Sequence, residues 1–215
     1  MTERTNLRRL PERGSHDREV IDAILREALI CHVGFADDAG RPVVIPTIHA
    51  LVGDTLYLHG SVASRMLRTI GDGANVCVNA TIVDGLVMAR SHFHHSMNYR
   101  SVVLFGTARL VDDPAEKDRA FAAIVDHIAR GRWEDARQPS PVEDRQTMVV
   151  AVSIDEASAK ARTGGPHDDA DDYELDVWAG VIPVQATYGE PVPDPDTTRE
   201  VPLPAYLDGY RRGSL

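Results

Sequence analysis

The stretch that decides the fold is Thr55-Leu-Tyr-Leu-His-Gly-Ser-Val-Ala-Ser-Arg-Met-Leu-Arg-Thr-Ile70. Its first half predicts an apolar strand, and its second half predicts a short helix that is capped by Ser61. The first turn of that helix carries Ser64 and Arg65, and Arg68 follows one turn later. Unpaired N–H groups at a helix start attract anions, and arginine grips a phosphate through two parallel hydrogen bonds. The stretch therefore suits a phosphate monoester, and the alternative is a capped amphipathic helix with solvated arginines.

Composition narrows the class of protein. The 215 residues are 43% hydrophobic, which is enough for one buried core, and the net charge is -10. An acidic chain disfavours nucleic acid as the main partner, because phosphate backbones attract basic surfaces. Cys31 and Cys77 stand in apolar runs without metal-like spacing, and no apolar run approaches membrane-spanning length. We therefore expect a soluble cytoplasmic protein that binds neither nucleic acid nor membrane.

The pattern along the chain divides it into three parts: an N-terminal arm over residues 1–14, a domain over residues 15–190, and a tail over residues 191–215. An amphipathic helix is expected after Ser15 as its N-cap. A second helix is expected after Asp113, with a capping box completed by Glu116, and residues 132–146 are expected to be a polar loop. Strands are predicted over residues 30–36, 41–52, 55–59, 75–83, 86–89, 99–111 and 147–154, with a possible extension over 158–162. Short strands joined by hairpins, with few helices, predict a mainly β antiparallel barrel.

A histidine-rich turn, Ser91-His-Phe-His-His-Ser96, is the second conspicuous cluster. Imidazole pairs bind zinc, copper or haem iron, so a metal site is one interpretation. No carboxylate or cysteine is interleaved, however, and a tight site usually needs three ligands. We therefore expect no metal here and a turn that lines a ligand cleft. The acidic run over residues 168–172 lacks the spacing of a calcium loop and is expected to be a solvated turn.

Taken together, several short motifs resemble one family. They are Gly60-Ser61 with Ser64-Arg65, then Asn98-Tyr-Arg-Ser-Val102, Phe105-Gly-Thr-Ala108, Lys160-Ala-Arg-Thr-Gly-Gly-Pro166 and Trp178-Ala-Gly-Val-Ile-Pro183. Over residues 15–190 the chain resembles the pyridoxamine 5'-phosphate oxidase-like, FMN-binding split-barrel superfamily, in its flavin-nucleotide-binding and nitroimidazole-resistance branch. The resemblance implies a six-stranded antiparallel split β-barrel. It also implies a homodimer that holds one FMN in each of two clefts between the subunits.

The resemblance also implies roles for individual residues. Ser64 and Arg65 would hold the FMN phosphate, with Arg68 as a second cation. The remaining cofactor-binding residues are His59, Gly60 and Ser61 along the ribityl chain and the ring edge, Pro46 and Thr47 at the ring, Ser101 from the partner subunit, and Trp178, which would stack near the ring or close the cleft. Lys160 and Arg162 are either a solvated strand end or basic residues that project into the partner's cleft. His94 or His95 would donate a proton at the flavin face, since imidazole titrates near neutrality.

The expected function is that of an FMN-dependent oxidoreductase, which passes electrons from a nicotinamide or another small reductant to a small organic acceptor. The alternative is a non-catalytic carrier or sensor of flavin, deazaflavin or haem. Oxidation of pyridoxamine phosphate itself is not expected, because Met66 stands where those oxidases carry a basic residue. The chain has no Gly-x-Gly-x-x-Gly fingerprint, so a nicotinamide would bind only transiently at the flavin cleft.

Overall fold

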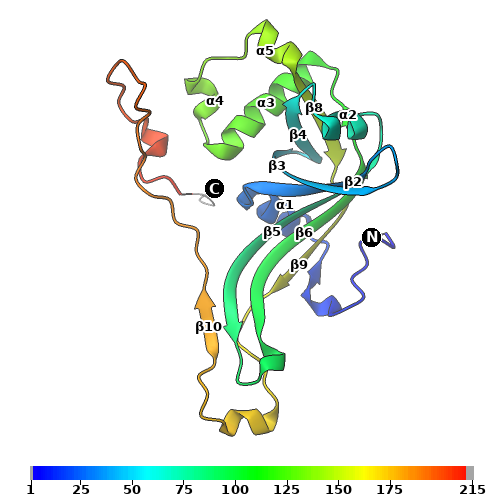
Figure 1. Cartoon of the computed structure of the whole chain (residues 1–215), viewed down its shortest axis with the longest axis vertical. Helices are drawn as coiled ribbons and strands as arrows, with labels where there is room; N and C mark the ends of the chain where they lie inside the picture. The colour runs from blue at the N-terminus through cyan, green and yellow to red at the C-terminus, as the bar shows by residue number, and fades with distance from the viewer. Residues whose placement is uncertain (1, 212–215) are drawn as a thin grey trace.

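A single antiparallel sheet of ten strands organises residues 2–211, the part of the chain that the computed structural model describes (Figure 1). Its strands pair in the order β1-β9-β6-β5-β2-β3-β4-β8-β7, and β10 pairs with β5. The strands are β1 (Gly14–Ser15), β2 (Ile30–Ala36), β3 (Pro42–Val52), β4 (Thr55–Ser61), β5 (Asn75–Met88), β6 (Ser96–Thr107), β7 (Arg109–Leu110), β8 (Thr147–Ser153), β9 (Glu156–Arg162) and β10 (Gly180–Pro183). The end strands β1 and β7 do not pair with each other, so the sheet is not closed. The predicted mainly β, antiparallel split barrel is confirmed, but the sheet has ten strands instead of the six expected: seven longer strands and the short β1, β7 and β10.

The helices are α1 (Arg18–Glu27), α2 (Arg65–Gly71), α3 (Pro114–Ile128), α4 (Arg132–Asp135) and α5 (Pro141–Gln146), with 3-10 turns η1 (Pro11–Arg13), η2 (His92–His94), η3 (Ala170–Glu174) and η4 (Ala205–Leu207). Helices α2 to α5 gather at one end of this sheet, and α1 lies near its middle, as Figure 1 shows. Within residues 2–211, none of the helices has the length and apolar character needed to cross a membrane.

Two apolar clusters hold the helices on the sheet. The larger one lies inside the curved sheet and joins Ile24 of α1 and Leu67 of α2 to strand residues such as Leu104. The smaller one joins Ile124 of α3 to Tyr57 and neighbouring strand residues. Because alternate strand residues point to opposite faces, the strand at Tyr57 contributes to both clusters and is covered on both sides.

Two of the predicted helix caps are wrong by a few residues. The cap of α1 is Asp17, whose carboxylate accepts the Glu19 N–H at 2.9 Å, while Ser15 belongs to β1. The cap of α2 is Ser64, whose hydroxyl accepts the Leu67 N–H at 3.3 Å, while Ser61 still belongs to β4. In both places a cap-type residue a few positions upstream competed with the true one, because serine and aspartate serve equally well in caps and turns.

The α3 region contains one confirmed cap and one misplaced capping box. Asp113 caps α3 as predicted, through the Glu116 N–H at 2.9 Å. The Glu116 carboxylate instead accepts hydrogen bonds from the Tyr57 hydroxyl and from Arg109. The capping box occurs at α5, between Ser140 and Glu143. The predicted polar loop over residues 132–146 therefore contains two short helices, α4 and α5.

The strands predicted over 75–83 and 86–89 form one long strand, β5, whose register with β6 shifts at Asp84. This bulge is stabilised by Arg100 of β6, which donates to Asp84 at 2.7 and 2.9 Å and to Glu27 of α1 at 2.8 Å. Beyond the bulge, β10 pairs with β5, and a Cβ added at Gly85 would lie 2.9 Å from a Val181 methyl. We call residues 84–98 of this hairpin, with the segment 163–183 that pairs with it, the distal arm (Figure 1).

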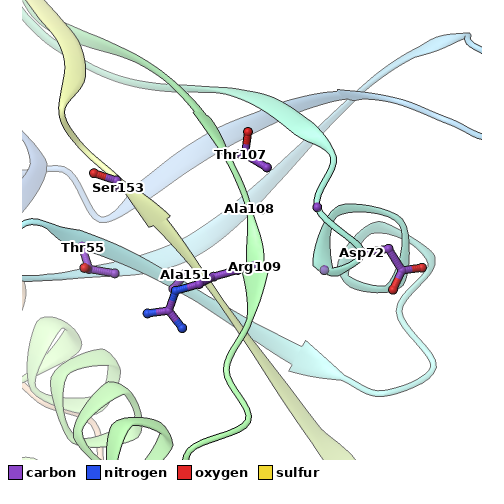
Figure 2. Close-up of a pocket in the computed structure, with 9 residues that line it drawn as sticks. Thr55, Asp72, Thr107, Ala108, Arg109, Ala151 and Ser153 are labelled. Carbon is purple, nitrogen blue, oxygen red and sulfur yellow. The ribbon is translucent and has the colours of Figure 1, made fainter.

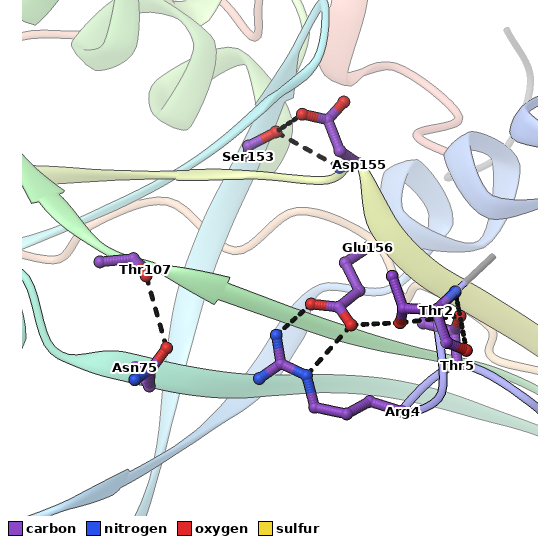
Figure 3. A network of polar contacts seen from close by, with 8 residues as sticks. All are labelled: Thr2, Arg4, Thr5, Asn75, Thr107, Ser153, Asp155 and Glu156. Atoms are coloured by element: carbon purple, nitrogen blue, oxygen red, sulfur yellow. Dashed lines mark hydrogen bonds and ion pairs between the residues drawn. The ribbon is translucent and has the colours of Figure 1, made fainter.

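The N-terminal residues lie against β6 and β9, as Figure 3 shows. The Arg4 side chain donates to the Glu156 carboxylate at 3.0 Å and lies over the Phe105 ring at 5.0 Å. Thr5 is buried, and the Lys160 ammonium donates to the Arg9 carbonyl at 2.8 Å. Much of the N-terminal arm predicted over residues 1–14 is therefore packed against the sheet.

Candidate functional site

The start of α2 presents two cations. Arg65 and Arg68 are exposed, and within residues 2–211 neither makes a hydrogen bond or an ion pair with another side chain. The hydrogen bond from Arg41, and to a smaller extent the charge of Arg65, lowers the pKa of Asp37 in the β2–β3 turn. Ser64 is already used as the helix cap. The two guanidinium groups are therefore the strongest available contacts for an anion here.

The end of β4 leads directly into this region. A Cβ added at Gly60 would lie 3.1 Å from a Leu67 methyl, so glycine lets the strand approach α2 closely. The Ser61 hydroxyl accepts the Ala63 N–H at 3.1 Å. The Nδ1 atom of His59 is buried, without a partner among the described residues, and burial lowers the pKa of this imidazole. His59 therefore presents a neutral ring at neutral pH.

The neighbouring part of β3 carries Pro46 and Thr47. Pro46 is exposed and lies opposite His32 of β2, and at this point β3 pairs on one side only, because its pairing with β4 begins at His49. A one-sided position is where a strand tolerates proline, because its missing N–H costs no ladder hydrogen bond there. Thr47 is half-buried, and its hydroxyl donates to the Ile48 carbonyl at 3.4 Å.

Ser101, Lys160 and Arg162 are engaged inside their own chain. The Ser101 hydroxyl donates to the Lys160 carbonyl at 3.2 Å. Arg162 is 6% exposed and donates to Asn98 and to the Gly165 carbonyl, the latter at 2.9 Å. Burial lowers the pKa of the Arg162 guanidinium, and these hydrogen bonds replace the lost hydration. The structure thus shows Lys160 and Arg162 as neither a solvated strand end nor free cations, and their role toward a partner's cleft stays a prediction.

The histidine-rich turn lies at the tip of the distal arm. The His95 Nδ1 atom is 2.9 Å from the Ser91 carbonyl oxygen, and His94 Nε2 is 3.4 Å from a carboxylate oxygen of Asp169. Potential ligand atoms of His94, Asp169 and Asp172 all lie within 4.8 Å of one another. No carboxylate stands within the histidine-rich stretch of the sequence, but the fold brings two carboxylates to it. They come from a distant segment, which local spacing could not reveal.

The acidic run over residues 168–172 is only partly the solvated turn that the sequence suggested. The Asp168 side chain is 0% exposed and accepts hydrogen bonds from the Arg90 N–H, the Arg90 guanidinium and the Ser91 N–H, at 2.9, 3.1 and 3.3 Å. The guanidinium of Arg90 also lies 4.7 Å from the centre of the Tyr173 ring. Asp168 therefore fastens the connecting segment to the hairpin tip.

Within one chain the predicted residues form two groups. The first group surrounds the start of α2, and the second group, with His94, His95 and Trp178, lies on the distal arm at the other end of the sheet (Figure 1). Trp178 is 67% exposed, and its ring lies beside Gly180, where an added Cβ would be 2.9 Å away. A single chain does not bring the two groups together.

A separate pocket of about 490 Å³ opens beside the C-terminal end of α2, and sequence reasoning did not find it. Figure 2 shows Asp72, Thr107 and Arg109 among the side chains around it. Arg109 is paired with Glu116 at 3.1 Å, which neutralises its charge. This pocket is distinct from the predicted phosphate contacts, because it lies at the opposite end of α2.

Comparison with known proteins identifies the family of this chain and two similar solved structures. The chain belongs to the pyridoxamine 5'-phosphate oxidase family, whose model matches residues 17–161. It is 38% identical to the flavocytochrome Anf3 from Azotobacter vinelandii, with a TM-score of 0.91 over 98% of both chains. It is 36% identical to an FAD and heme binding protein from Mycobacterium smegmatis, with a TM-score of 0.88 over 93% of this chain and 98% of that one.

A more distant solved structure comes from the branch that the sequence motifs indicated. It is a putative 5-nitroimidazole antibiotic resistance protein from Bacteroides thetaiotaomicron, which is 27% identical over 68% of this chain and 85% of that one, with a TM-score of 0.58. No curated protein matches the chain. The family places the chain among flavin-binding split barrels, as its sequence motifs suggested.

Proposed function

We propose that the protein is a flavin-dependent redox protein that also binds haem. The observation that carries this proposal is its similarity, over nearly the whole chain, to two solved structures, one described as a flavocytochrome and one as an FAD and heme binding protein. The similarity extends through the distal arm and the tail, beyond the family match over residues 17–161. A function that depends on the whole chain therefore fits better than one confined to the barrel.

The start of α2 fits the phosphate end of a flavin. Arg65 and Arg68 supply two guanidinium groups that have no side-chain partner within residues 2–211, and Gly60 lets β4 pack closely against Leu67 of the helix that carries them. The neutral His59 ring and the backbone at Pro46 and Thr47 would face the flavin nucleus. FMN, predicted from the sequence, and FAD, named for one similar protein, share the phosphate next to the ribityl chain, so the same contacts serve both. When bound, the flavin supplies the hydride and electron transfer.

A second copy of the chain would complete the cleft. The two groups of predicted residues lie at opposite ends of one chain, so a homodimer would let the distal arm of one protomer reach the flavin contacts of the other. Exposed apolar side chains on that arm, including Phe93, Met97 and Trp178, support such an interface. In this arrangement His94 or His95 would donate a proton to a small organic acceptor, with a nicotinamide or another small reductant as the electron source.

The tip of the distal arm also has features that suit haem. Iron-ligating histidines usually fix one ring nitrogen on a carbonyl or carboxylate, which orients the other. His95 has this form, because its Nδ1 atom is held at the Ser91 carbonyl while the side chain is exposed. Phe93, 89% exposed, offers apolar surface for a porphyrin beside it. His95 would therefore be the residue that holds a haem iron, in competition with its proposed role as proton donor.

The absorption spectrum of the purified protein tests the cofactors. We expect flavin bands and a haem Soret band together, and loss of the Soret band with retained flavin in His95→Ala. His167→Ala is the matched control, because His167 is an exposed histidine outside the turn. A Soret band that survives His95→Ala would remove His95 as the ligand, and a protein that binds no haem on reconstitution would leave a flavin-only oxidoreductase or carrier.

Flavin titration tests the phosphate contacts. Arg65→Ala should weaken FMN binding by roughly a hundredfold, since a charge-assisted contact of about 2–3 kcal/mol is removed. Arg41→Ala, which removes a nearby arginine already paired with Asp37, should change little. Equal affinity for FMN and riboflavin would overturn the phosphate assignment. Oxidation of NADH or NADPH by the flavin-loaded protein then separates an enzyme from a carrier.

A further inference from the structure

The tip of the distal arm brings together three metal-ligating side chains from two segments that are remote in sequence. His94 comes from η2, and Asp169 and Asp172 come from the segment around η3. Their potential ligand atoms lie within 4.8 Å of one another, and His94 Nε2 is 3.4 Å from Asp169 Oδ2. From these positions the geometry points to a binding site for a divalent transition-metal ion, which we propose as an addition to the flavin and haem.

The electrostatics of the cluster favour a cation. Two carboxylates converge on one imidazole, and the guanidinium of Arg90, at the start of the turn, is already paired with the buried Asp168 side chain. A divalent ion would balance the two negative charges, and a neutral imidazole would complete a three-ligand set with room for water. Mixed nitrogen and oxygen donors suit Zn²⁺ or Co²⁺ better than Ca²⁺, which takes six or more oxygen ligands.

The two segments are held in place independently of any metal, which makes the site preorganised. Asp168 accepts three hydrogen bonds from Arg90 and Ser91, directly beside the ligand histidine turn. The neighbouring Tyr173 lies under the Arg90 guanidinium. Because this buried contact stabilises the approach of the two segments, the three ligand atoms stay close without needing an ion to gather them. A bound metal would then pin the hairpin tip to the connecting segment.

The assignment divides the work of the histidine-rich turn. His94 faces the carboxylates, whereas His95 is directed to the Ser91 carbonyl. A metal at His94 would therefore leave His95 for the role at the flavin or haem. This inference does not depend on either cofactor, because its ligands and its support lie entirely within the distal arm of one chain.

Calorimetric titration of the full-length protein with Zn²⁺ tests the site. We expect saturable binding of one ion per chain, weakened about tenfold or more, equivalent to 1.4 kcal/mol, in each of His94→Ala and Asp172→Asn. The matched controls are His92→Ala and Asp171→Asn, which remove an imidazole and a carboxylate from the same two segments without touching the cluster. Both controls should bind Zn²⁺ as the parent protein does.

Thermal unfolding of the same set of proteins gives a second measurement. Zn²⁺ should raise the midpoint of the parent protein and of both controls, and should raise it less in the two ligand variants, because an ion that binds only the folded state stabilises it. Absence of saturable binding would overturn the proposal. So would equal affinity in the parent and the ligand variants, or an equal loss in Asp171→Asn, which would show that only the general negative charge of the segment attracts the ion.

Discussion

The barrel body and the distal arm share strands β5 and β6, yet they differ in what covers those strands. In the body, Leu104 of β6 is 0% exposed, because α1 and the opposite strands close over it. In the arm, Phe93 and Trp178 stand largely in solvent. The β5–β6 hairpin is therefore buried in the core at one end and exposes apolar side chains at the other. The exposed apolar surface of the arm is the one that we propose to contact a second protomer or a cofactor.

The bulge at Asp84 marks the boundary between the two regions. There Arg100 joins the β5 bulge to Glu27 at the end of α1, so the body also determines how the arm leaves the sheet. A bulge increases local twist and bends a strand. The distal arm is thus an extension of β5 and β6, and its direction depends on the ion pairs of Arg100 with Asp84 and Glu27.

Core truncation should give the largest difference between the regions. Leu104→Ala should lower the free energy of unfolding by about 3–4 kcal/mol, because it leaves a cavity in a closed core. Phe93→Ala, in the arm, should change the free energy of unfolding of the monomer by no more than about 0.5 kcal/mol. Urea unfolding at a concentration where the monomer dominates measures both. Comparable losses in the two variants would mean that the arm is buried within its own chain.

Disruption of the arm surface should act on association. Trp178→Asp should weaken dimerisation by about 2 kcal/mol or more, because a large aromatic side chain at an interface is a frequent hot spot. Val192→Asp is the control, since Val192 is 90% exposed but lies in the tail beyond β10. Sedimentation equilibrium gives both dissociation constants. A parent protein that remains at 23.6 kDa at micromolar concentration would refute the homodimer itself.

The sequence predicted the barrel body better than the distal arm. In the body, alternation and turn residues located most strands, and the cap of α3 at Asp113, because those signals are local. In the arm, the pairing of β10 with β5 and the approach of Asp169 to His94 depend on contacts between remote segments. Arg162 shows the same limit: its sequence position left open a solvated strand end, whereas the structure buries it and pairs it with Asn98, and its role toward a partner's cleft stays a prediction. Local pattern cannot distinguish these outcomes.

The ion-pair network at the boundary should matter less than the core but more than an isolated surface pair. Arg100→Gln should cost about 1–2 kcal/mol, because two carboxylates lose their common partner in a partly buried place. The control Arg41→Gln breaks an exposed pair with Asp37 and should cost about 0.5 kcal/mol or less. Hydrogen exchange should also show faster opening of β5 beyond the bulge in Arg100→Gln. An unchanged exchange rate there would show that the Arg100 ion pairs do not stabilise the distal arm.

The smallest expected effect is a pH dependence that belongs to the body alone. Burial lowers the pKa of His59 below its ordinary value of about 6.5, so between that value and the lower folded-state pKa the unfolded chain binds more protons than the folded one. The stabilising contribution is therefore complete above about pH 6.5 and is lost as the pH falls below it. From pH 7.5 to 5.5 the loss should be at most about 1.4 kcal/mol, the equivalent of one pH unit.

His59→Asn cannot titrate, so its free energy of unfolding, measured in urea at the same two pH values, should fall less than that of the parent. His92→Asn, at an exposed histidine of the arm, is the control for the substitution itself. If both variants follow the parent, the His59 ring is more hydrated in solution than its burial implies.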